Sequence, residues 1–213
     1  MAGGRGRFIT LEGGEGAGKS TQARRLAAEL AARGVDCLLT REPGGSAGAE
    51  EIRGLLVNGD PERWSPTTEA LLLTAARRDH LERTVQPALA AGRWVVCDRF
   101  SDSTLAYQGF GAGLPLDNLR ALFRLALDGF TPDLTLVFDL PVEIGLARAA
   151  ARSGGEDRFE RMGVDFHQRL RSGFLAIAAA EPERCAVIDA SADIDIVSAD
   201  VLAAVCARLP ECA

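Results

Sequence analysis

Residues 12–21 read Glu-Gly-Gly-Glu-Gly-Ala-Gly-Lys-Ser-Thr, and this stretch decides the fold. The β-prone run Phe8-Ile9-Thr10-Leu11 precedes it, and Leu26 and Leu30 mark the core face of a helix that follows. The chain is therefore expected to run from a strand through a glycine-rich loop into a helix. In that context the spacing Gly13-x-x-x-x-Gly18-Lys19-Ser20 predicts a phosphate-binding loop.

The residue types in this loop account for phosphate binding. Glycines allow consecutive backbone N–H groups to point at an anion, and the helix N-terminus adds a partial positive charge. Lys19 is expected to reach the β- and γ-phosphates of ATP, and the Ser20 hydroxyl to bind Mg²⁺. Of the 24 basic residues only Lys19 is a lysine, which indicates that an ammonium group matters there. The residues expected to hold the nucleotide are Gly13, Gly14, Glu15, Gly16, Ala17, Gly18, Lys19, Ser20 and Thr21.

Length and composition limit the class of protein. The 213 residues, of which 47% are hydrophobic and 25% charged, predict a single globular domain over residues 1–213. The net charge of −6 argues against a protein that covers nucleic acid non-specifically. We expect no membrane association and a cytoplasmic location, because the sequence has neither a secretory h-region nor a run of about 18 apolar residues. Five scattered cysteines without a CxxC pair predict reduced thiols rather than disulfides or a zinc site.

The order of the expected elements indicates the architecture. Strands are expected at 8–11, 35–40, 94–97, 134–138 and 185–189, and helices at about 49–57, 65–91, 101–108, 116–127, 141–152, 166–175 and 194–209. Strands that alternate with helices predict an α/β fold, with one five-stranded parallel sheet and helices on both faces. Asp139 is expected to cap the helix that Pro141 opens, and a place in the phosphate site is the alternative.

Charged residues follow two of these strands. In parallel sheets ligands bind at the carboxyl ends of the strands, where this sequence has Arg41 and the pair Asp98-Arg99. A small-molecule kinase must hold a second substrate and supply positive charge to the transferring phosphoryl group. Regulatory GTPases are excluded, because their Asn-Lys-x-Asp guanine reader needs a lysine and none follows Lys19.

A set of motifs in a fixed order extends this interpretation. They are the loop at 12–21, Arg41-Glu42-Pro43-Gly44, Ala75-Ala76-Arg77, Asp98-Arg99-Phe100-Ser101-Asp102-Ser103, Ala106-Tyr107-Gln108-Gly109 and Pro132-Asp133-Leu134. In these motifs the chain resembles bacterial thymidylate kinases over almost its whole length. The block from Asp98 to Gly109 is the specific part, because many families share the phosphate-binding loop.

The resemblance implies a P-loop nucleoside-monophosphate kinase fold that transfers the γ-phosphate of ATP to dTMP with Mg²⁺, giving dTDP and ADP. It also implies a homodimer packed through helices. The resemblance implies that Arg41 and Arg99 hold the dTMP phosphate. It implies that Arg77 hydrogen-bonds the thymine edge and that Ser103 and Gln108 face the base. It also implies that Tyr107 crowds the sugar 2′ position, that Glu15 accepts from the 3′-hydroxyl, and that Asp98 organises Mg²⁺ or the neighbouring arginine.

A mobile lid is implied at about residues 148–161. Its arginines are candidates for stabilising charge on the moving phosphoryl group, with Arg152 the first choice and Arg158 the second. In one branch of the family the phosphate-binding loop itself carries an arginine, where this chain has Gly16. The glycine therefore fits the branch in which the lid supplies the arginine.

One position departs from the family pattern. Four residues before Arg77 the family usually has a phenylalanine that stacks on thymine, whereas this chain has Leu73. Two alternatives therefore stay open: a P-loop kinase for another nucleotide or a deoxynucleoside, and a nucleotide-binding regulator that turns over slowly. His80 and His167 have no partner at ligand spacing, and structural or surface roles are expected for both.

Overall fold

The computed structural model describes residues 5–60, 62–151 and 158–212. One parallel sheet contains five strands in the order β2-β3-β1-β4-β5. The strands are β1 (Phe8–Gly13), β2 (Cys37–Arg41), β3 (Trp94–Asp98), β4 (Leu134–Asp139) and β5 (Cys185–Asp189). The predicted five-stranded parallel sheet is confirmed, with strand boundaries within two residues of expectation.

Helices connect the strands and cover both faces of the sheet. The α-helices are α1 (Lys19–Ala32), α2 (Ala47–Leu56), α3 (Pro66–His80), α4 (Gln86–Ala90), α5 (Ser101–Thr104), α6 (Leu116–Leu127), α7 (Val142–Ala150), α8 (Val164–Ala180) and α9 (Ile194–Arg208). Two π-helical segments, η1 (Leu81–Val85) and η2 (Leu105–Gly111), continue α3 into α4 and extend α5, and the 3-10 segment η3 (Pro210–Cys212) follows α9. Ser65 caps α3 by accepting a hydrogen bond from the Thr68 N–H.

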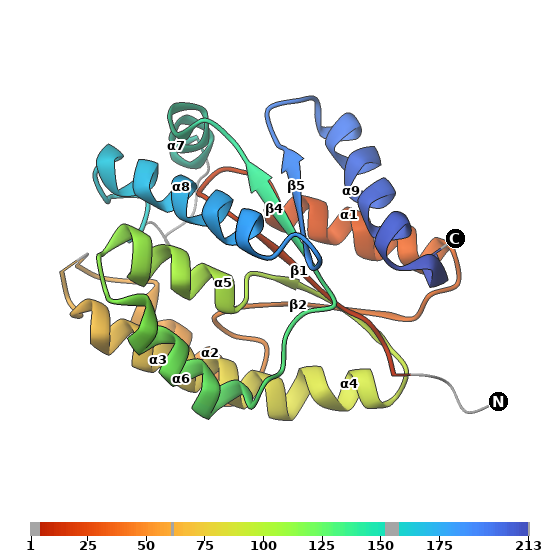
Figure 1. Ribbon diagram of the computed structural model, residues 1–213, viewed down its shortest axis with the longest axis horizontal. Helices are drawn as coiled ribbons and strands as arrows, with labels where there is room; N and C mark the ends of the chain where they lie inside the picture. The colour runs from red at the N-terminus through yellow and green to blue at the C-terminus, as the bar shows by residue number, and fades with distance from the viewer. Residues whose placement is uncertain (1–4, 61, 152–157, 213) are drawn as a thin grey trace.

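The core lies in two layers on either side of the sheet. On one face α1 and α9 pack side by side, and Leu26 and Leu30 of α1 lie against Ile9 and Leu136 (Figure 1). On the other face α4 covers β3, and α8 covers β4 and β5. Burial of each leucine side chain contributes roughly 2 kcal/mol to folding.

Strand register brings the functional loops together. β1 pairs with β3 and β4, and Asp98 at the end of β3 lies beside Leu11 on one side and Arg41 on the other. Because the strands are parallel, the phosphate-binding loop after β1 and the segments after β2 and β3 emerge at one edge of the sheet.

Two expectations are wrong. Asp139 does not cap the following helix, because Arg171 of α8 engages its two oxygens through Nε at 2.6 Å and Nη2 at 2.9 Å. Cys206 and Cys212 form a disulfide instead of staying reduced, since the turn after α9 brings their Cα atoms to 5.0 Å. Across the described parts of the chain, no helix combines the length and apolar character needed to cross a bilayer.

Candidate active site

The phosphate-binding loop connects β1 to α1 and depends on left-handed backbone at two of its glycines. Gly16 has φ of 69° and Gly18 has φ of 85°, a region that side chains disfavour. Gly16 also packs against α7: a Cβ at this position would lie 2.0 Å from the carbonyl oxygen of Gly145. The loop is thus in direct backbone contact with the helix that leads into the predicted lid.

Lys19 begins α1 and folds back over the loop. Its Nζ donates to the Gly14 carbonyl at 2.6 Å, and the residue is 6% exposed. Burial, aided by the positive charge of Arg99, lowers the pKa of Lys19 to about 8, although nearby carboxylates oppose the shift. A phosphate oxygen could take the place of the Gly14 carbonyl and favour the charged ammonium.

Ser20 and Asp98 form the pair of oxygen donors that the sequence predicts for Mg²⁺. The Ser20 hydroxyl donates to Asp98 Oδ2. Asp98 Oδ1 is buried and has no hydrogen-bond partner among the described residues. A carboxylate with a spare buried oxygen beside a hydroxyl is a hard-oxygen donor set that suits Mg²⁺, so the residues present fit the ion.

Arg99 occupies an unusual backbone conformation directly after β3. Its φ is 71°, which is costly for a residue with a side chain. Nη1 donates to the Gly13 carbonyl at 3.0 Å and to Ser103 Oγ at 3.2 Å, and Nη2 donates to Glu15 at 3.0 Å. Burial disfavours the charge, but the surrounding Tyr107, Glu15 and other acidic groups outweigh it and raise the pKa of Arg99. The strained turn thus presents a permanent cation beside the phosphate-binding loop.

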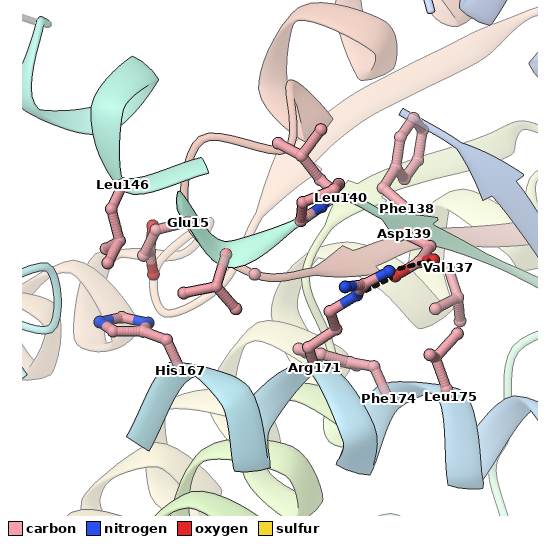
Figure 2. Close-up of a pocket in the computed structure, with 13 residues that line it drawn as sticks. Glu15, Val137, Phe138, Asp139, Leu140, Leu146, His167, Arg171, Phe174 and Leu175 are labelled. Carbon is pink, nitrogen blue, oxygen red and sulfur yellow. Dashed lines mark hydrogen bonds and ion pairs between the residues drawn. The ribbon is translucent and has the colours of Figure 1, made fainter. Parts of the chain in front are cut away.

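Glu15 binds polar partners from two segments, the turn after β3 and η2. Its Oε1 accepts from Arg99 and from the hydroxyl of Tyr107 in η2. Figure 2 shows Glu15 and His167 pointing into a small cavity of about 20 Å³ between β4, α7 and α8. The His167 ring is buried, with Nε2 lacking a partner in the part of the chain that the structure describes. Burial lowers the pKa of His167, while the charge of Glu15 acts in the opposite direction.

Arg77 lies inside the protein, although it sits on a helix rich in charged residues. Its Nε donates to Glu42 at 2.7 Å, and Nη2 donates to the Phe100 carbonyl and to Thr104, each at 3.0 Å. Its Nη1 is buried and lacks a partner among the described residues. His80 supports the same carboxylate, with Nδ1 3.0 Å from Glu42. Arg77 therefore offers one fixed, unused donor.

Gln108 and Ser103 lie close to this arginine but have different partners. Gln108 Nε2 donates to Glu69 at 3.0 Å, whereas its Oε1 is buried and unpaired within the described residues. Ser103 Oγ donates to Glu12 at 2.5 Å and accepts from Arg99. Gln108 thus provides an unused acceptor, whereas Ser103 is occupied by protein groups.

A cavity of about 570 Å³ joins these groups to the phosphate-binding loop. The predicted acceptor-site residues that line it are Glu15, Arg41, Leu73, Arg77, Arg99, Ser103, Tyr107 and Gln108. Arg41 also pairs with Glu50 at 3.1 Å and is half exposed. A cavity of this size accommodates a nucleotide-sized ligand.

Some lining and supporting residues were missed by the sequence analysis. Arg53 of α2 and Phe159 line the cavity, Glu42 holds Arg77, and Glu69 holds Gln108. Glu12, fully buried in β1, holds Ser103. A signal existed for Glu12 alone, as a carboxylate in an otherwise apolar strand.

The two candidate lid arginines have different outcomes. Arg152 lies outside the described residues. Arg158 is fully buried and bonds Glu69, the Leu56 carbonyl at 3.2 Å and the Asp60 carbonyl at 2.9 Å. Its contacts are therefore with α2, the segment after it and α3, and it is not among the residues that line the cavity.

Comparison with known proteins agrees with this geometry. The family model described as thymidylate kinase matches residues 11–201. The chain belongs to the thymidylate kinase family. Thymidylate kinase of Caulobacter vibrioides is 59% identical over 204 residues, which cover 96% of this chain and 98% of the relative. That of Dinoroseobacter shibae is 59% identical over 93% of this chain and 95% of its own length.

A solved structure supports the same assignment. The crystal structure of thymidylate kinase from Ehrlichia chaffeensis has a TM-score of 0.77 and 33% identity, covering 94% of this chain and 99% of that chain. The predicted family and the predicted P-loop kinase fold are confirmed.

Proposed function

We propose that the cavity transfers the γ-phosphate of ATP to dTMP, giving dTDP and ADP. Membership of the thymidylate kinase family supports this activity. The single observation that carries it to this chain is one cavity with Lys19 near one end and two unused base-reading atoms, on Arg77 and Gln108, near the other.

The base-reading atoms match the edge of thymine. Arg77 Nη1 is a donor that would serve the O4 carbonyl, and Gln108 Oε1 is an acceptor that would serve the N3–H group. Both atoms are buried, so each gains more from a complementary ligand than an exposed group would. Cytosine presents the opposite pattern, an acceptor at N3 and an amine at C4. The pair therefore favours a keto pyrimidine.

Two arginines would hold the phosphate of the acceptor nucleotide. Arg99, held rigidly beside the loop, and Arg41, at the end of β2, both line the cavity. Guanidinium groups bind phosphate through two parallel hydrogen bonds, so this end of the cavity suits a nucleotide better than a nucleoside. Tyr107 lies against Arg99 and would limit room at the sugar 2′ position, and Glu15 would accept from the 3′-hydroxyl.

The donor side follows from the phosphate-binding loop. Loop N–H groups and Lys19 would orient the β- and γ-phosphates, and Ser20 and Asp98 would hold Mg²⁺. Mg²⁺ supplies positive charge to the phosphate oxygens when bound. Transfer in line needs no covalent intermediate, so catalysis rests on positioning and charge. The lid over 148–161 and its Arg152 remain our proposal for the charge that completes the site.

We also propose a homodimer and a cytoplasmic location. Leu71 of α3 and Leu125 of α6 are 51% and 83% exposed, and the two helices pack together (Figure 1). Apolar side chains exposed on neighbouring helices support a contact with a second copy. Sedimentation velocity of the wild type and of Leu125→Asp tests the dimer, and cell fractionation tests the location.

Release of ADP in a coupled assay tests the function. Purified protein with Mg·ATP is compared on dTMP, dUMP, dCMP, dGMP, UMP and thymidine. We expect strong preference for dTMP and little turnover of thymidine, which offers no phosphate to Arg41 and Arg99. Preference for another acceptor would overturn the substrate assignment. ATP binding without acceptor-dependent turnover would instead favour a regulator.

A further inference from the structure

Glu69 lies one step behind the acceptor end of the cavity and joins two elements. It belongs to the first turn of α3 and is 4% exposed. One carboxylate oxygen accepts from Gln108 Nε2 at 3.0 Å, and the other pairs with Arg158 Nη2. Glu69 itself does not line the cavity, so any effect on a ligand acts through Gln108.

The chemistry of this contact fixes the Gln108 amide. An ionised carboxylate accepts hydrogen bonds and cannot donate them, so the Gln108 NH₂ group must face Glu69. Rotating the amide by half a turn would place two oxygens against each other in a buried site, at the expense of a hydrogen bond. The Gln108 oxygen is thereby left buried and unpaired on a residue that lines the cavity.

Arg158 in turn holds Glu69. Its guanidinium is fully buried and also donates to the carbonyls of Leu56 and Asp60, which anchors it at the end of α2. A buried carboxylate needs a cationic partner to offset the cost of its desolvation, and Arg158 is that partner for Glu69. It is the first residue described after the gap in the predicted lid, so the base of this segment is tied to the acceptor site.

We propose that Glu69, paired with Arg158, is a positioning residue that sets the Gln108 amide so that the cavity selects bases with a ring N–H donor. Keto pyrimidines carry such a donor at N3, whereas cytosine carries an acceptor there. This inference deepens the proposed function and rests on it. It assigns Arg158 a role in choosing the acceptor instead of contact with the transferring phosphoryl group.

The first test is the isosteric variant Glu69→Gln. A neutral amide at 69 can meet Gln108 in either orientation, so the preference for one orientation is lost. We expect the ratio of kcat/KM for dTMP over dCMP to fall roughly tenfold. The loss should lie mainly in KM for dTMP, with KM for ATP unchanged. Arg158→Lys, which keeps the charge, should lose less selectivity than Arg158→Met.

Controls separate this effect from general damage. Arg120 is an exposed residue on α6, and Arg120→Gln should leave the ratio of kcat/KM for dTMP over dCMP as in the wild type. In a Gln108→Leu background, Glu69→Gln should have little further effect on base choice. Should Glu69→Gln fold poorly because Arg158 loses its carboxylate partner, the double variant Glu69→Gln/Arg158→Met removes both charges and should show the same loss of selectivity.

A measurement that does not depend on turnover distinguishes the positioning role of Glu69 from the proposed function. The side-chain NH₂ signals of Gln108, assigned by their absence in Gln108→Leu, should shift on Glu69→Gln in the ligand-free protein. A folded Glu69→Gln protein with unchanged NH₂ signals or an unchanged dTMP-to-dCMP ratio would overturn the positioning role. Wild-type protein that fails to phosphorylate dTMP, while these signals shift as expected, would overturn the proposed function and the base selection built on it.

Discussion

The Glu12 carboxylate accepts a hydrogen bond of 2.7 Å from the Phe100 backbone N–H. Glu12 lies inside the sheet, whereas Phe100 follows the strained Arg99. The contact therefore ties the turn that carries this arginine, which we propose binds phosphate, to the central strand. Ser103 donates to the same carboxylate and also contacts Arg99. A buried acid thus supports the backbone conformation on which the acceptor site depends.

The burial of Glu12 predicts that the stability of the folded protein depends on pH. Burial, with the nearby charge of Asp102, raises the pKa of Glu12 from 4.5 to about 7. Because the folded state holds its proton more tightly than the unfolded state, the wild type should lose stability as pH rises from about 4.5 to 7. Relative to Glu12→Gln the loss should approach about 3 kcal/mol. Urea unfolding of both proteins from pH 4.5 to 8 measures it, and parallel curves would contradict the prediction.

Arg77 predicts a change in acceptor binding. Arg77→Lys keeps a cation for Glu42 but lacks the second guanidinium nitrogen that faces the cavity. We expect KM for dTMP to rise about tenfold or more, with kcat changed much less. Steady-state kinetics measure both constants. The exposed neighbour serves as control, since Arg78→Gln should leave KM for dTMP as in the wild type. Equal KM values for Arg77→Lys and the wild type would rule out base recognition by Arg77.

Asp98 predicts a dependence on Mg²⁺. Asp98→Asn replaces one of the two carboxylate oxygens beside Ser20 with an NH₂ group and removes the negative charge. We expect kcat to fall about 100-fold and the concentration of MgCl₂ needed for half-maximal activity to increase. Titration with MgCl₂ at saturating ATP and dTMP checks this. Asp36→Asn, on the surface beside Arg93, is the matched control. A normal MgCl₂ titration in Asp98→Asn would place the ion elsewhere.

Leu73 lines the cavity where the family usually has an aromatic side chain. Leu73→Phe should restore stacking on the base and tighten dTMP binding about two- to tenfold, as expected from an aromatic contact worth roughly 0.5–1.5 kcal/mol. Calorimetric titration with dTMP measures Kd. Leu55→Phe, exposed on α2, should have no effect. Unchanged or weaker binding by Leu73→Phe would show that the leucine is already sufficient.

Arg152 lies outside the described residues, and its role stays a prediction. If it stabilises charge that develops only during transfer, Arg152→Ala should lower kcat far more than it raises KM for dTMP. Kinetics at saturating ATP separate the two constants. Equal effects on both would mean that Arg152 binds substrate uniformly.

Local patterns explain what could be predicted from the sequence. The phosphate-binding loop is a contiguous motif between a strand and a helix, and continuous apolar runs such as Leu134–Phe138 mark buried parallel strands. Because parallel strands end at the same edge of a sheet, the sequence placed Arg41 and Asp98 at one edge. The register of β2 and β3, which pairs these two residues, agrees with that placement.

Pairings between distant residues explain what could not be predicted. Arg158 was expected to face the phosphates, but its partner Glu69 is 89 positions away, and no local pattern indicates that contact. Asp139 was expected to act locally as a cap, yet Arg171 takes both of its oxygens. In each case a long-range ion pair overrides the local preference of the residue.

The backbone contact between Gly16 and Gly145 limits how this chain could change by mutation. An arginine introduced at position 16 would drive its Cβ into the Gly145 carbonyl, so α7 would have to move first. The resemblance implies two branches of the family, which differ in where the catalytic arginine originates. A single substitution at position 16 of this sequence would therefore not convert one branch into the other. A displacement of α7 would have to precede that substitution. The present packing of α7 therefore restricts position 16 to glycine during evolution.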